Sequence, residues 1–146
     1  MRFAETLGAA LWLAVLVMVV PAALAAETNQ ISEVTFNRPV RISDQTTLPA
    51  GTYWFQIMNH LTAPNMVVIY DNDRTHIEAR LLTIPTYRDK VRGRTEMILA
   101  LGTQNHPPIL VRWFFRGSHS GHEFVYSPKI EHRIGKEVST TILAKP

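Results

Sequence analysis

Short runs of β-branched and aromatic residues recur along this chain every eight to fifteen residues, with turn-forming residues between them. This spacing is typical of an all-β sandwich or barrel. The sequence therefore predicts an antiparallel β-sandwich or flattened barrel of seven or eight strands with a short C-terminal helix. We expect the strands at Glu33–Phe36, Val40–Ile42, Thr52–Asn59, Met66–Tyr70, Thr75–Ile84, Thr95–Leu101, Ile109–Phe115 and Glu123–Tyr126.

The alternation of residue types indicates how some strands are placed. Polar and apolar side chains alternate through Thr75–Ile84, which predicts a strand with one face in water. By contrast, Thr95–Leu101 is apolar on both faces apart from Glu96, so we expect it in a central position.

The C-terminal segment has a different period. Three apolar residues stand four positions apart: Ile130, Ile134 and Val138. This pattern predicts an amphipathic helix over Pro128–Val138, with Ser127 as the N-cap and Pro128 as the first helical residue. Ser139–Leu143 could add a last edge strand.

The N-terminal segment has the features of a secretory signal peptide. Met1–Thr6 carries one cation, Leu7–Leu24 is almost wholly apolar, and Ala23-Leu24-Ala25 offers small residues for cleavage. We therefore expect residues 1–25 to be removed, leaving a single domain over residues 26–146 in the periplasm or outside the cell. An uncleaved membrane anchor is the alternative, because the apolar stretch is about long enough to span a bilayer.

Composition narrows the classes of function. The expected mature chain keeps 14 of the 15 basic residues and 11 of the 12 acidic ones, a balance of +3, and it has no cysteine. Its core must therefore be stable without disulfides. The modest charge does not indicate nucleic acid as a partner, and no later apolar run predicts a transmembrane segment in the mature chain.

Three segments resemble a group of small exported β-rich bacterial proteins of unknown function. They are Leu48-Pro49-Ala50-Gly51-Thr52-Tyr53, Trp113-Phe114-Phe115 and Gly121-His122-Glu123-Phe124-Val125-Tyr126. The likeness extends from about Phe36 to Tyr126. It implies a β-rich domain on the envelope side and transfers no catalytic residue.

A loop rich in glycine and serine contains candidate metal ligands, His119, His122 and Glu123. Two imidazoles and a carboxylate can bind Zn²⁺ or Cu²⁺, and His60, His76 or His106 could supply a further ligand. The alternative interpretation leaves His119 exposed and has His122 hold the loop through hydrogen bonds.

A second candidate site is a run of alternating cations, Arg88, Lys90, Arg92 and Arg94. On an extended hairpin tip they could hold a polymer rich in phosphate or uronic acid. The alternative is a solvated edge that resists aggregation.

The residues carry no nucleophile motif, so the chain is not predicted to be an enzyme, and no cofactor is predicted. We expect a non-catalytic exported domain whose partner is an envelope protein or an anionic polysaccharide or lipid surface. One alternative is a metal carrier or enzyme that uses the His119, His122 and Glu123 loop. Another is a small β-barrel that binds an apolar ligand.

Overall fold

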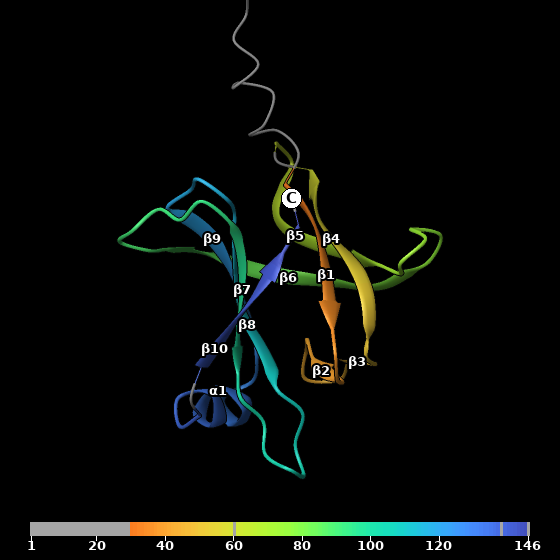
Figure 1. Ribbon diagram of the computed structural model, residues 1–146, viewed down its shortest axis with the longest axis vertical. Coiled ribbons are helices and arrows are strands. Elements are labelled where there is room, and N and C mark those ends of the chain that lie inside the picture. Colours follow the sequence, from red (N-terminus) through yellow and green to blue (C-terminus); the bar gives the residue numbers. More distant parts are fainter. Residues whose placement is uncertain (1–29, 60, 138, 146) are drawn as a thin grey trace, which may run out of the picture.

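The computed structural model describes residues 30–59, 61–137 and 139–145. These residues form ten strands in one sheet and one short C-terminal helix, so the all-β prediction is confirmed (Figure 1). The strands are β1 (Ile31–Phe36), β2 (Val40–Arg41), β3 (Thr47–Leu48), β4 (Gly51–Asn59), β5 (Ala63–Tyr70), β6 (Ile77–Tyr87), β7 (Thr95–Ala100), β8 (Ile109–Phe114), β9 (Ser120–Phe124) and β10 (Ser139–Ala144). The predicted signal peptide lies outside the described residues.

The count of seven or eight strands was too low. Each of the eight predicted strands is present with shifted ends, and β3 and β10 are additional. β3 has only two residues, too few to show an alternating pattern. β10 corresponds to the edge strand that Ser139–Leu143 could add. β7 pairs with β8 on one side and β10 on the other, which confirms its central position.

The sheet folds on itself because β6 changes its neighbour halfway along. β6 pairs with β5 from Ile77 to Leu82 and with β9 from Thr83 to Tyr87. Pro85 lies in the second part, where pairing is with β9 alone, and a strand edge tolerates a residue without an N–H donor. The far ends of the sheet meet in a single bridge between Glu33 and Lys145, so the described strands do not form a closed barrel.

Aromatic rings fill the space between the two halves of the folded sheet. The ring of Phe55 on β4 packs edge-on against Trp113 of β8 and Phe124 of β9, with centroid separations of 6.0 and 6.4 Å. All three side chains are buried. Trp113 also donates its indole N–H to the hydroxyl of Ser32 on β1, at 3.2 Å. A cysteine-free chain thus joins its two halves by ring packing and a buried hydrogen bond.

The helix α1 (Pro128–Ile134) begins where the sequence predicts and ends earlier. Ser127 is the N-cap residue, but its side chain makes no cap hydrogen bond; its backbone N–H donates instead to the Asp44 carboxylate, at 3.1 and 3.2 Å. The predicted end at Val138 was wrong, because Gly135 caps the helix and the described residues beyond it are not helical. Val138 itself lies outside the described residues. Within the described part of the chain, no helix is long and apolar enough to cross a membrane.

Gly121 allows two strands to approach closely. It pairs with Phe114 across β8 and β9, and a Cβ atom there would lie 2.5 Å from both the Phe114 ring and the Trp113 carbonyl oxygen. The Phe114 ring therefore covers the backbone of Gly121, an arrangement that protects a strand glycine. This explains physically why glycine opens the segment Gly121–Tyr126.

Replacing Gly121 with alanine should lower the free energy of unfolding by about 1–3 kcal/mol, the usual effect of adding a methyl group to a filled site. Gly93 provides the matched control, since a Cβ at that position would meet nothing within 4 Å. Gly93→Ala should stay within about 1 kcal/mol of the parent. Urea unfolding followed by tryptophan fluorescence measures both, and equal effects of the two changes would contradict this account.

Candidate functional site

Arg88 is the fixed centre of the predicted basic tip. Its Nε donates to the Ser118 carbonyl at 3.0 Å, its Nη2 to the Phe115 carbonyl at 2.9 Å, and its Nη1 to the Glu96 carboxylate at 3.1 Å. The guanidinium also lies over the Phe114 ring, 4.9 Å from its centroid. Burial lowers the pKa of Arg88, and the adjacent Glu96 carboxylate opposes this change. Arg88 therefore joins the loop before β7 to the loop before β9.

Glu96 gathers two more arginines from the same tip. Its side chain is only 4% exposed, and its carboxylate lies 3.6 Å from Arg92 Nε and 3.3 Å from Arg94 Nε. Both of these arginine side chains are more than half exposed. The buried carboxylate therefore orients the two arginines while their outer surfaces remain in water.

The structure adds Arg116 to the cations that the sequence pattern singled out. Its loop runs beside the tip, because Gly117 N–H donates to the Arg92 carbonyl and Arg88 N–H donates to the His119 carbonyl. We call the exposed residues Lys90, Arg92, Arg94 and Arg116 the basic loop surface. No sequence pattern pointed to Arg116, because it lies on a different loop, more than twenty positions from the alternating run.

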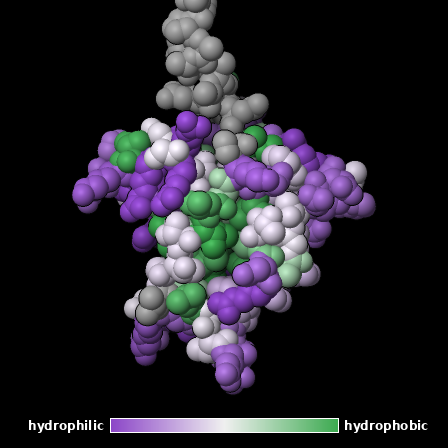
Figure 2. Space-filling view, in the orientation of Figure 1, coloured by the Kyte–Doolittle hydropathy of each residue, from purple (hydrophilic) through white to green (hydrophobic). Residues whose placement is uncertain are grey.

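The charge excess of the protein is concentrated here. Residues 88–96 and Arg116 carry five cations and two carboxylates, a balance of +3, which equals the formal charge of the whole chain. The remainder of the chain is therefore balanced. Figure 1 places the two loops together at the upper left, and Figure 2 shows strongly hydrophilic groups there.

Of the four cations predicted as ligand-binding residues of the hairpin tip, Arg88 is not exposed. Its side chain is 11% exposed and its donors are taken up by the protein. Of the four predicted ligand-binding residues, Lys90, Arg92 and Arg94 are exposed, whereas Arg88 holds the loops in place.

Replacing Arg88 with serine should lower the free energy of unfolding by about 2–3 kcal/mol. Loss of one partner of a buried ion pair usually costs about 3–5 kcal/mol, but Arg92 and Arg94 still face Glu96 in the variant. Arg94→Ser is the matched control and should change stability by less than about 1 kcal/mol, as expected for an exposed pair. Chemical unfolding measures both variants, and an unaffected Arg88→Ser protein would show that the buried pair is dispensable.

The predicted metal ligands are not brought together. His119 is exposed and its Nδ1 bonds to the Arg88 carbonyl at 2.9 Å. His122 and Glu123 are successive residues of β9, so they point to opposite faces: His122 is buried, and Glu123 accepts from Arg112 Nε at 2.8 Å. Among the residues that the structure describes, no three His, Asp or Glu side chains are grouped so as to hold a metal ion. This geometry gives the metal hypothesis no support.

The further ligands considered are also engaged elsewhere. His76 lies 3.1 Å from the Asp71 carboxylate and His106 Nδ1 bonds to Thr103 at 3.2 Å, while His60 lies outside the described residues. The alternative interpretation of the loop, with His119 exposed and His122 hydrogen-bonded, matches the structure.

His122 is held as a neutral imidazole. Thr83 Oγ1 donates its single hydrogen to the Asn65 carbonyl at 3.0 Å. The 2.9 Å bond between Thr83 Oγ1 and His122 Nδ1 must therefore use a hydrogen on Nδ1, so the ring is the donor. The rings of Trp113 and Phe115 lie 6.0 and 5.7 Å away. Burial lowers the pKa of His122 below its ordinary value of 6.5.

This burial predicts a loss of stability in weak acid. In the unfolded chain, His122 takes up a proton as the pH falls through about 6.5, whereas the folded protein keeps it neutral to lower pH. The unfolded state then binds more protons, so the free energy of unfolding falls by up to about 1.4 kcal/mol per pH unit. Unfolding curves recorded as the pH is lowered below about 6.5 should show this fall in the free energy of unfolding, and His122→Gln should reduce it.

The matched control is His132→Gln, at an exposed position on α1. It should leave the dependence of the unfolding free energy on pH unchanged. A slope that persists in full in His122→Gln would assign the titration to another group.

The alternative of an apolar ligand inside a barrel is also unsupported by the geometry. The space between the sheet halves is filled by buried side chains. A cavity of about 440 Å³ opens between β1 and β10, but Asn37, Arg38 and threonines share its lining with Phe36, Leu99 and Ile142. Such a mixed lining is not the enclosed apolar interior that this alternative requires.

Scans against protein-family models, curated proteins and solved structures gave no match to this chain. The resemblance to small exported bacterial proteins therefore stays a prediction, and function has to be argued from the site.

Proposed function

We propose that this chain is an exported, non-catalytic domain that binds an anionic cell-surface polymer through the basic loop surface. The observation that carries the proposal is the concentration of the whole formal charge excess in two adjacent loops. Export rests on the signal-peptide features of residues 1–25.

The packing of these loops favours binding over mere solubility. An edge that only resists aggregation needs exposed charge and no fixed geometry. Here Arg88 ties the loops together with hydrogen bonds to two carbonyl groups, and Glu96 orients Arg92 and Arg94. Ordering these side chains before binding reduces the entropy lost when a ligand is bound. Guanidinium groups also bind carboxylate, sulfate and phosphate oxygens through two parallel hydrogen bonds.

Retention on immobilised heparin tests the proposal. Lys90→Ser combined with Arg116→Ser should weaken binding by about tenfold or more, since each cation near an anionic surface contributes about 1 kcal/mol. Neither residue forms an ion pair among the described residues, so folding should be preserved. Added salt should release the parent protein, because exposed charges are screened over about 10 Å at 0.1 M.

The matched control removes the same charge elsewhere, with Arg38→Ser and Arg80→Ser, both at exposed positions. It should elute close to the parent. An equal loss of heparin retention in both double variants would mean that retention depends only on net charge. If the parent showed no salt-sensitive retention, the tip would be only a solvated edge. Retention of the parent only by an envelope protein would favour the protein-partner alternative.

A further inference from the structure

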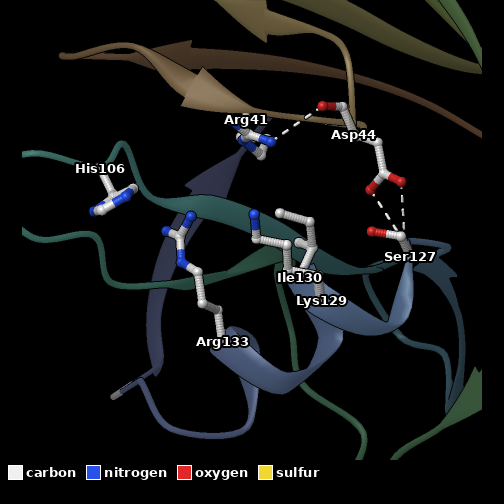
Figure 3. Close-up of a pocket in the computed structure, with 7 residues that line it drawn as sticks. All are labelled: Arg41, Asp44, His106, Ser127, Lys129, Ile130 and Arg133. Atoms are coloured by element: carbon white, nitrogen blue, oxygen red, sulfur yellow. Dashed lines mark hydrogen bonds between the residues drawn. The ribbon is translucent and has the colours of Figure 1, made fainter.

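A second group of cations lies away from the basic loop surface, around a cavity beside α1. A cavity of about 360 Å³ opens between β2 and α1, and its lining consists of Arg41, Asp44, His106, Ser127, Lys129, Ile130 and Arg133. Figure 3 shows Arg41, Lys129 and Arg133 ending around the same space, with His106 at one side. The helix lies at the bottom of the molecule in Figure 1, away from the basic loop surface. A cavity of this volume falls at the lower end of the range for small-molecule sites.

Two of the acidic side chains near this cavity, Asp44 and Glu137, accept hydrogen bonds. Both oxygens of the Asp44 carboxylate accept from the Ser127 N–H. Glu137 Oε1 accepts from Nε and Nη2 of Arg133, at 3.4 and 3.3 Å, while its Oε2 is buried with no partner in the described part of the chain. The cations of the lining therefore face the cavity, while the Asp44 carboxylate is directed toward the backbone of Ser127.

Arg41 is held in place at the edge of the cavity. Its Nη1 donates to the Asp44 carbonyl at 3.1 Å, whereas its Nε is buried and has no hydrogen-bond partner in the described part of the chain. The backbone of Arg41 is fixed by β2, where its N–H donates to the Pro108 carbonyl at 2.8 Å.

We infer that this cavity binds the phosphoryl group of a small phosphate monoester. The Arg41 guanidinium, the Lys129 ammonium and the outer nitrogen of Arg133 approach from two elements and in different directions. A phosphoryl group presents three strong acceptor oxygens and close to two negative charges. A carboxylate offers two oxygens in one plane and is satisfied by a single guanidinium fork. Three separate cations therefore match phosphate better than carboxylate.

The rest of the lining accommodates the organic part of the ester. Ile130 is a buried apolar residue of α1, while Ser127 and His106 add polar groups. This combination of one apolar surface and a few polar groups is suited to a compact, hydroxylated group of monosaccharide size. The site does not depend on the basic loop surface and is a separate binding function.

Calorimetric titration of the purified chain with glucose 1-phosphate, at low salt, tests the inference. Glucuronate, a sugar of similar size with a carboxylate, should bind at least tenfold more weakly. Lys129→Gln should weaken glucose 1-phosphate binding at least tenfold, whereas the control Lys136→Gln, at an exposed position just beyond α1, should change it less than twofold. Amide NMR shifts on titration should centre on Arg41 and α1.

Three other results of these measurements would contradict the inference. Equal affinity for glucuronate would overturn the phosphoryl assignment, and equal effects of Lys129→Gln and Lys136→Gln would overturn the site. Absence of binding by the parent protein, with NMR shifts unchanged, would overturn the inference entirely. The variant with Lys90→Ser and Arg116→Ser should bind glucose 1-phosphate like the parent, so failure of this inference and failure of polymer binding can be distinguished.

Discussion

The change of neighbour along β6 is the constraint on which the rest of the structure depends. Because β6 pairs with β5 over its first half and with β9 over its second, one continuous sheet turns back on itself. Its two inner faces then meet around Phe55, Trp113 and Phe124. In a chain without disulfides, this aromatic contact helps to join the halves, and close ring packing contributes beyond the area buried.

The same turn determines where the charged loops lie. The second half of β6 ends at Tyr87, directly before Arg88, and its partner β9 begins directly after the loop that carries Arg116. Two loops from different parts of the chain are thus brought side by side at one end of the sheet. Arg88 and Glu96 form a largely buried ion pair between and beneath them. Removing charge from water is costly unless partners and hydrogen bonds replace the solvent, and Arg88 has both.

The two electropositive regions differ in physical character, which is why they suit different ligands. The basic loop surface is exposed and is held by the Arg88–Glu96 pair beneath it, so it can contact a long polyanion at several points. The cavity beside α1 is concave and small, and its cations converge. Convergent donors select a compact anion by geometry, whereas a spread of exposed cations responds mainly to charge density and ionic strength. The intervening sheet keeps the two regions apart.

Much of the fold could be predicted from residue order because a strand imposes a period of two on its side chains. Runs of β-branched and aromatic residues located eight strands, alternation indicated the faces of some of them, and apolar residues four positions apart after Pro128 located α1. The sequence also identified Lys90, Arg92 and Arg94 as exposed cations. It could not show that Arg88 is buried, that Arg116 joins the same surface, or that Arg41, Lys129 and Arg133 line one cavity. Those facts depend on which strands become neighbours, and pairing between distant segments is decided by the packing of the whole core rather than by any local pattern.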